Sequence, residues 1–154
     1  MSLADLNLKF SYNNQNCDII KDFLEPALSE AIEYDRAVGF FSSSALMSAS
    51  IGIKNLVKNG GKIKLVCSPR LSEEDTNAIK LGYEKRKIIE ESINNSFEEP
   101  QNEFEKERLN ILSHLIADGI MDIKIAFMHS DSNQSMFHVK IGLIKGSNNN
   151  CVAF

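Results

Sequence analysis

The sequence predicts an α/β domain in which helices flank a mixed β-sheet. A continuous apolar run at 36–41, a helical stretch, Gly60-Gly61 and a second strand-like run at 62–67 follow one another. This order is typical of a βαβ unit, whose strands are parallel and whose crossover is right-handed. Alternating apolar segments at 121–128 and 136–145 add further strands. With 154 residues, of which 43% are hydrophobic and 25% charged, we expect a single domain, 1–154, with its own core.

Composition also excludes several classes of protein. No apolar run approaches the roughly 18 residues of a membrane span, and the N-terminus lacks the basic and apolar regions of a signal peptide. Cys17, Cys67 and Cys151 are odd in number and far apart, which argues against a zinc site or a disulfide framework. We therefore expect a cytoplasmic protein with reduced thiols, no metal site and no membrane association.

The N-terminal part is expected to be mainly helical. Residues 3–10 are weakly strand-like, and from Asp18 to Ala31 apolar residues recur at helical spacing. Pro26 lies inside this pattern and should kink the helix or split it at Glu25, because proline lacks the amide N–H and clashes with the preceding turn.

Serines follow the first predicted strand. Ser42, Ser43 and Ser44 are candidates for the N-cap of a helix that runs to about Lys58. Ser42 and Ser43 are also candidate substrate-binding residues, since a helix N-terminus can hold a phosphate. Asn59-Gly60-Gly61 should end this helix before the strand at 62–67.

A helical insertion is expected at about 72–118, between the strands at 62–67 and 121–128. Arg70 leaves the preceding strand and is a further candidate for substrate binding. A capping box at 72–75 opens the insertion, and Gly119 should end it. Its charge-rich stretch, 84–108, is read as a solvated face.

The predicted strand at 136–145 carries the strongest chemical signal. Its apolar row is Phe137, Val139, Ile141 and Leu143, whereas His138 and Lys140 share the opposite face. An imidazole can act as nucleophile or general base, and an ammonium group can hold a phosphate oxygen. The competing interpretation is that these two residues are only the solvated face of a half-buried strand.

Three segments together resemble the phospholipase D superfamily. They are 35–43 (DRAVGFFSS), 60–65 (GGKIKL) and 137–142 (FHVKIG). The closest resemblance is to the phospholipase D-like nuclease domains found at the N-terminus of bacterial DEAD/DEAH-type and SNF2-type helicases. It implies a phospholipase D-like half-domain, and a helicase motor later in the same full-length chain. The apolar run at 151–154 also reads as a strand cut short, so we expect the chain to be an N-terminal fragment of a longer protein.

The resemblance further implies a metal-independent phosphodiesterase that acts on DNA and uses no cofactor. In this family one histidine attacks phosphorus and a second, from another copy of the motif, protonates the leaving oxygen. By resemblance His138 is the nucleophile and Lys140 holds the non-bridging oxygens. The chain has one such pair, so a homodimer or a second copy elsewhere in the protein must supply the other.

One departure from the family pattern leaves an alternative open. In the family pattern the motif lysine is followed by four residues and then Asp, whereas this chain has Lys145 at that position. The alternative is a catalytically inactive module that positions nucleic acid or mediates dimerisation, and the net charge of −4 is also unlike a nucleic-acid binder. A lipid substrate is disfavoured because no basic amphipathic helix is evident. His114 and His129 are read as packing or solvated residues.

Overall fold

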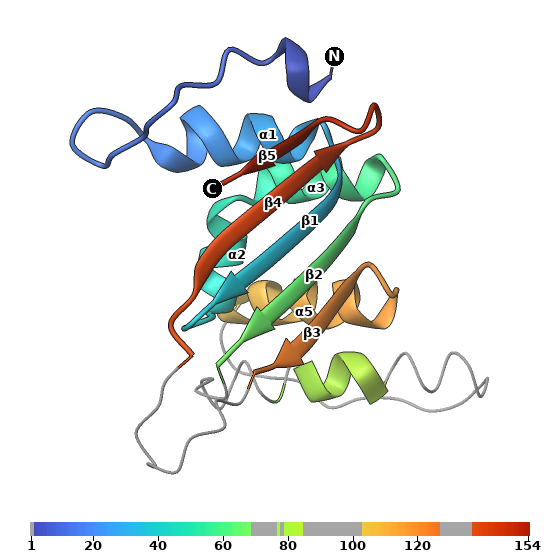
Figure 1. Ribbon diagram of the computed structural model, residues 1–154. Coiled ribbons are helices and arrows are strands. Elements are labelled where there is room, and N and C mark those ends of the chain that lie inside the picture. The colour runs from blue at the N-terminus through green and yellow to red at the C-terminus, as the bar shows by residue number, and fades with distance from the viewer. Residues whose placement is uncertain (1, 69–76, 78, 85–102, 127–136) are drawn as a thin grey trace.

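A computed structural model describes residues 2–68, 77, 79–84, 103–126 and 137–154. Its strands form one mixed sheet in the order β3-β2-β1-β4-β5 (Figure 1). They are β1 (Ala31–Val38), β2 (Lys62–Cys67), β3 (Met121–Ile125), β4 (Lys140–Gly146) and β5 (Cys151–Ala153). Strands β1, β2 and β3 are parallel, whereas β4 is antiparallel to β1 and β5 is antiparallel to β4. The predicted α/β class, the mixed sheet and the parallel pairing of β1 with β2 are therefore confirmed.

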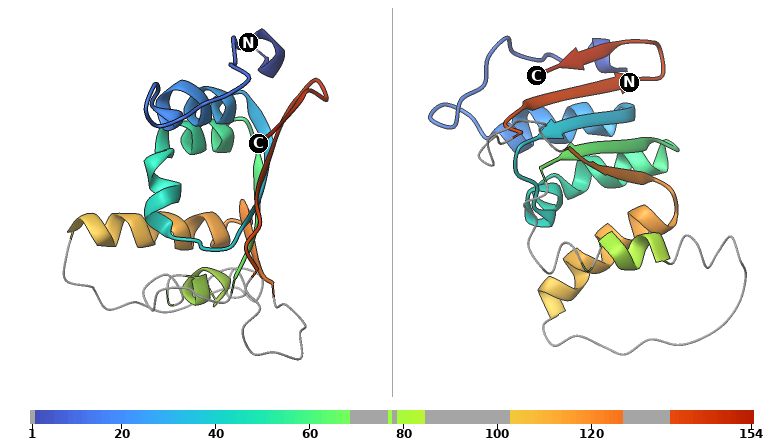
Figure 2. Two further views of the ribbon diagram at one scale, coloured as in Figure 1. Left: turned by 60° about the vertical axis from the view of Figure 1, so that its left-hand side comes forward. Right: turned by 60° about the horizontal axis from the view of Figure 1, so that its bottom comes forward.

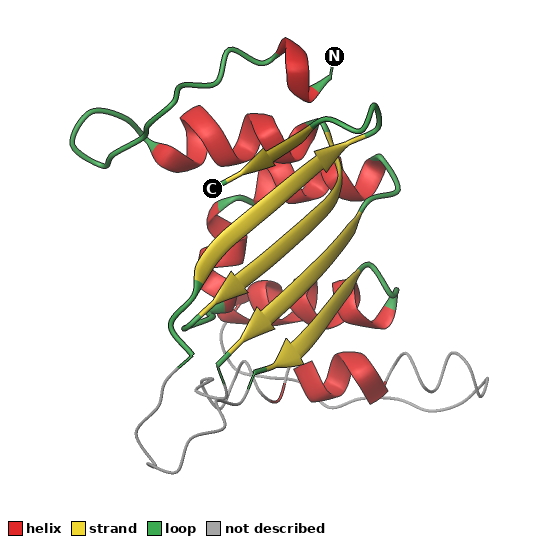
Figure 3. Ribbon diagram, in the orientation of Figure 1, coloured by secondary structure: helices red, strands yellow, loops and turns green. Residues whose placement is uncertain are grey.

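The helices lie on one face of the sheet (Figures 2 and 3). They are α1 (Glu25–Ser29), α2 (Ser43–Ser48), α3 (Ser50–Lys58) and α5 (Glu103–Ala117). In the described part of the chain no helix covers the other face, which we call the open face. No described helix is long and apolar enough to cross a membrane.

The core lies between this helical layer and the sheet. Tyr34 of β1 pairs in register with Ile63 of β2 and with Ile144 of β4, so these three side chains share the helix-covered face. Ile63 and Ile144 are 1% and 0% exposed. Leucines and isoleucines of the helices form the other side of this core: Leu28, Ile53, Leu56, Leu112 and Ile116.

Strand β1 begins earlier than predicted. The strand was expected at 36–41 and the helix was expected to reach Ala31, but α1 ends at Ser29 and β1 runs from Ala31 to Val38, so 39–41 lie beyond its end. Glu33 and Asp35 interrupt the continuous apolar pattern on which the predicted strand was based. Both point to the open face, where lysines neutralise them. The predicted kink or split at Glu25 takes another form: a π-helical stretch at 20–24 passes directly into α1 at Glu25, so the helix changes type there but is not interrupted. The weak strand signal at 3–10 was wrong, because Leu3–Asp5 is a 3-10 helix.

The crossover from β1 to β2 follows the prediction, except that the helix breaks at Ala49 between α2 and α3. Ser42 is the N-cap of α2, and its hydroxyl accepts a hydrogen bond from the amide of Ala45. Gly60 has a φ of +72° just after α3, as expected for a glycine that ends a helix.

Strand β4 differs from the prediction in its start and in its faces. It begins at Lys140, and 137–139 are irregular. A half-buried strand would place the apolar row in the core, but Ile141 is 52% exposed and lies with Leu143 on the open face. Lys140, Gly142 and Ile144 share the helix-covered side instead, because they pair with Val38, Arg36 and Tyr34.

The predicted insertion is described only in part. Residues 79–84 and 103–117 are helical, whereas 72–76, 78 and 85–102 lie outside the described residues. The amide of Ile123 donates to the Tyr83 hydroxyl, which covers part of the outer edge of β3. At the other edge of the sheet, the ring of Phe154 occupies the space where Gly142 has no side chain, and it packs edge-on against Phe23.

Candidate functional site

The three motif segments meet around β1. Strand β1 lies between β2 and β4 in the sheet, so 35–43, 60–65 and 137–142 are neighbours although they are far apart in the sequence (Figure 1). The parallel strands β1 and β2 end where β4 begins, since Val38 pairs with both Cys67 and Lys140. Ligands of open α/β sheets commonly bind beyond the carboxyl ends of parallel strands.

His138 lies directly against the end of β1. A Cβ atom on residue 39 would be 2.6 Å from the carbonyl oxygen of Phe137 and 3.5 Å from Nδ1 of His138. Only glycine at position 39 allows this close approach of the two main chains. The His138 side chain is exposed, so it is not a packed core histidine.

Lys140 is the first residue of β4 and is exposed. It pairs with Val38 in the antiparallel ladder, next to the point where His138 meets Gly39. Within the described ranges, neither His138 nor Lys140 makes a side-chain hydrogen bond or ion pair. Both groups are thus chemically available to a ligand at this edge of the sheet.

The serines follow at the same end of β1. Ser42 is half-buried and caps α2, and Ser43 in the first turn of α2 is only 1% exposed. Arg70, the remaining candidate for substrate binding, lies outside the described residues, as does His129. His114 is exposed on α5 and is not part of the three motif segments.

Lys145 does not lie near His138 and Lys140. It lies five residues beyond Lys140 on the opposite face of β4, about 16 Å along the strand. Its Nζ is 3.1 Å from Oε1 of Glu33 and 3.2 Å from Oδ2 of Asp35. Lys64 of β2 completes the group, with its Nζ 2.6 Å from Oε1 of Glu33. We call Glu33, Asp35, Lys64 and Lys145 the ion cluster.

The ion cluster shifts the titration of its members. Hydrogen bonds from Lys64 and then Lys145 lower the pKa of Glu33 from 4.5 to about 2. The hydrogen bond to Glu33 is the main factor that raises the pKa of Lys145. The lysine that replaces the family aspartate therefore has a structural partner set on the open face.

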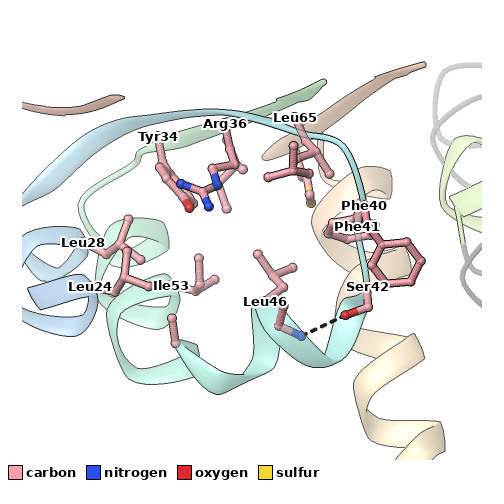
Figure 4. A pocket seen from close by; sticks show the side chains of 15 residues that line it. Leu24, Leu28, Tyr34, Arg36, Phe40, Phe41, Ser42, Leu46, Ile53 and Leu65 are labelled. Carbon is pink, nitrogen blue, oxygen red and sulfur yellow. Dashed lines mark hydrogen bonds between the residues drawn. The ribbon is translucent and has the colours of Figure 1, made fainter. Parts of the chain in front are cut away.

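A cavity of about 200 Å³ lies under β1, on the helix-covered side (Figure 4). Its walls are mainly aliphatic, but Tyr34 and Arg36 point into it from β1, and Ser42 lines one end. His138 and Lys140 do not line it. The prediction that these two residues share a cleft with Ser42 or Ser43 stays a prediction.

Sequence reasoning overlooked Arg36. The signal was present, because Tyr34, Arg36 and Val38 alternate with the charged residues Glu33 and Asp35. This alternation places an arginine on the side of β1 opposite the acidic residues. This alternation was missed because the strand was expected to begin only at Arg36.

Metal-ligating side chains do not converge in the described part of the chain, where no three His, Cys, Asp or Glu residues could hold an ion together. The thiols differ in environment. Cys67 is fully buried at the end of β2, and this burial raises its pKa to about 11, whereas Cys151 is exposed.

Comparison of the chain with protein families, with curated protein sequences and with solved structures finds no match.

Proposed function

We propose that this chain is a phospholipase D-like domain that hydrolyses phosphodiester bonds in DNA without a metal ion, within a longer protein that carries a helicase motor. The observation that carries this proposal is the meeting of segments 35–43 and 137–142 at the carboxyl end of β1, with segment 60–65 running beside β1 in the same sheet. There His138 and Lys140 are exposed, and neither is engaged by another described side chain.

The chemistry proposed for His138 has two steps. A ring nitrogen attacks phosphorus, a P–N bond forms, and the P–O bond to the leaving sugar oxygen breaks. A second histidine gives its proton to that oxygen. Water then attacks the phosphohistidine, the P–N bond breaks, and the second histidine takes the proton of the water. Lys140 stabilises the charge that builds on the non-bridging oxygens.

The second histidine must come from another copy of the motif. A two-fold contact between two chains would place one His138 opposite the other, because an isologous interface uses the same surface twice. A second motif elsewhere in the full-length protein would serve equally. DNA is the proposed substrate class because of the resemblance to helicase-attached nuclease domains.

Lys145 weakens this proposal less than its position in the motif suggests. It lies on the face opposite Lys140 and is paired with Glu33 and Asp35. Its charge is therefore neutralised away from the proposed site. A Lys145→Asp variant is not expected to create activity, because the new carboxylate would face the open side of the sheet.

A second candidate function is a non-catalytic module for dimerisation. It is favoured by an apolar row that crosses three strands of the open face, formed by Val66, Ala37 and Ile141 in register. Leu143 and Ala153 extend this row toward β5. In the described structure nothing covers the row, and Ile141 is 52% exposed. Such a surface is suited to packing against another protein surface.

Cleavage assays with matched variants distinguish the two functions. Labelled single-stranded and double-stranded DNA is incubated with the protein in EDTA, and bis(p-nitrophenyl) phosphate reports general phosphodiesterase activity. We expect cleavage by the wild type, none by His138→Ala, and weaker cleavage by Lys140→Ala. His114→Ala is the control, since it removes an exposed histidine far from the motif segments along the chain.

Other outcomes would reject the catalytic proposal. Cleavage that requires a divalent metal, or that survives His138→Ala, would place the chemistry in another site. No cleavage of any substrate, together with a dimer in sedimentation that Ile141→Glu dissociates, would favour the non-catalytic module.

A further inference from the structure

We propose that the cavity under β1 binds a small carboxylic acid with an apolar body, whose carboxylate is held by Arg36 and Tyr34. This inference is independent of the proposed phosphodiesterase, because His138 and Lys140 do not line the cavity. It rests on the cavity, on the direction of these two side chains, and on the fact that neither makes a hydrogen bond or ion pair with another described residue.

Arg36 is a half-buried cation without an anionic partner. In the residues that the structure describes, no carboxylate pairs with its guanidinium group, and its one contact of note is the Phe154 ring, 4.9 Å from Cζ. The acidic residues of β1, Glu33 and Asp35, point to the open face and bind Lys64 and Lys145 instead. Partly buried charges are usually paired, so an unpaired arginine beside a cavity indicates that an anion can bind there.

Tyr34 provides a second donor next to Arg36. The two residues are two apart on β1, and their side chains lie together at the roof of the cavity (Figure 4). Tyr34 is 9% exposed, and within the described ranges its hydroxyl makes no hydrogen bond. Because Tyr34 lines the cavity, this hydroxyl group can donate a hydrogen bond to a ligand bound there.

The other walls of the cavity favour a ligand with an apolar body. Leu24, Leu28, Leu46, Ile53, Ile63 and Leu65 supply aliphatic surface below and beside the two donors. A cavity of about 150 Å³ can admit benzene, so a volume of about 200 Å³ accepts a ring or chain of about six to eight carbons. Phe40 also lines the cavity and is 69% exposed, so the cavity opens to solvent at that end.

A carboxylate fits the two donors better than other anions. The guanidinium group offers parallel N–H donors that match the two oxygens of a carboxylate. A phosphate dianion would bring a second negative charge, for which no further cation lines the cavity. Benzoate and hexanoate are therefore suitable probes, with benzamide and hexanol as neutral analogues of similar size.

Methyl NMR titrations of the whole chain test the proposal. The methyl signals of Leu46 and Ile53 report binding, since both side chains line the cavity. We expect benzoate and hexanoate to bind at least about tenfold more tightly than the neutral analogues. Arg36→Met should lower the affinity for both acids by about tenfold to a hundredfold, and Tyr34→Phe should lower it by about twofold to tenfold. Lys54→Met, which removes an exposed cation of α3 outside this cavity, should bind the acids like the wild type.

Three results would overturn the proposal: no shift of the Leu46 and Ile53 methyls at millimolar acid, equal binding of acids and neutral analogues, or unchanged acid binding by Arg36→Met. If Arg36→Met does not fold, the wild type still decides the question. Intermolecular NOEs from the benzoate ring to these methyls would support the site, and their absence at saturating benzoate would reject it.

Discussion

Lys145 stabilises the fold through the ion cluster, and its replacement should be measurable. The Nζ atom of Lys145 contacts Glu33 and Asp35 at 3.1 and 3.2 Å, and Lys64 approaches the same two carboxylates at 2.6 and 3.9 Å. Two cations thus balance two anions. Lys145→Met leaves a net charge of −1 in the cluster, and Lys145→Asp leaves −2 with three carboxylates together.

The magnitude follows from Glu33. Its pKa falls from 4.5 to about 2, which corresponds to at most about 3.4 kcal/mol, since one pH unit is worth about 1.36 kcal/mol. The Glu33 side chain is 28% exposed, so water screens the cluster and about 1–2 kcal/mol is realistic. Lys64 supplies part of this stabilisation. We therefore expect Lys145→Met to lower the free energy of unfolding by about 1 kcal/mol, and Lys145→Asp by about 2 kcal/mol.

The pH dependence has a definite sign. The pKa of Glu33 is lower in the folded protein than in the unfolded chain, so the stabilisation is complete above about pH 4.5. It is lost as the pH falls from there through about 2. The difference between wild type and Lys145→Met should therefore shrink toward zero at about pH 2.

Urea denaturation at pH 7, 4 and 2.5 measures these differences, with Lys54→Met as a control that removes an exposed lysine outside the cluster. Equal stability of wild type and Lys145→Met at pH 7, or a Lys145→Asp variant more stable than wild type, would refute the reasoning. A difference that persists undiminished at pH 2.5 would show that Lys145 stabilises the protein by packing and not by charge.

Two further predictions concern the ends of β1 and β2. Gly39→Ala places a methyl group 2.6 Å from the carbonyl oxygen of Phe137, so we expect a loss of about 1–3 kcal/mol in urea denaturation and a shifted His138 imidazole signal by NMR; an unchanged His138 signal would contradict the described approach. Burial raises the pKa of Cys67 to about 11, so at pH 8 a disulfide reagent should modify the exposed Cys151 quickly and Cys67 only after unfolding. Rapid modification of Cys67 in the folded protein would show that the end of β2 is open to solvent.

Local signals in the sequence predicted those elements whose structure depends on nearby residues. Ser42 caps a helix because its hydroxyl reaches an amide three residues on. Gly60 ends a helix because glycine adopts positive φ without strain. Pro26 changes the helix type at Glu25 because its ring cannot fit an unbroken turn. Strand β2 and its parallel pairing with β1 followed from apolar runs separated by one crossover.

The candidate site could be predicted only in part. The sequence identified His138 and Lys140 as a pair, and the structure leaves both exposed beside the end of β1. It could not show that Gly39 is the residue against which His138 lies, because that contact joins segments about a hundred residues apart. It also could not show that Lys145 belongs to another group of side chains on the other face.

Tertiary structure alone decided the faces of the strands. The alternation in β4 is visible in the sequence, but either set of residues could have faced the helices. The register with β1 places Ile144 opposite Tyr34 and Gly142 opposite Arg36, and so sends Ile141 and Leu143 to the open face. The same register pairs Glu33 and Asp35 with lysines, and it leaves Arg36 without a carboxylate partner among the described residues. Periodicity shows which residues share a face, whereas pairing between distant strands decides what that face meets.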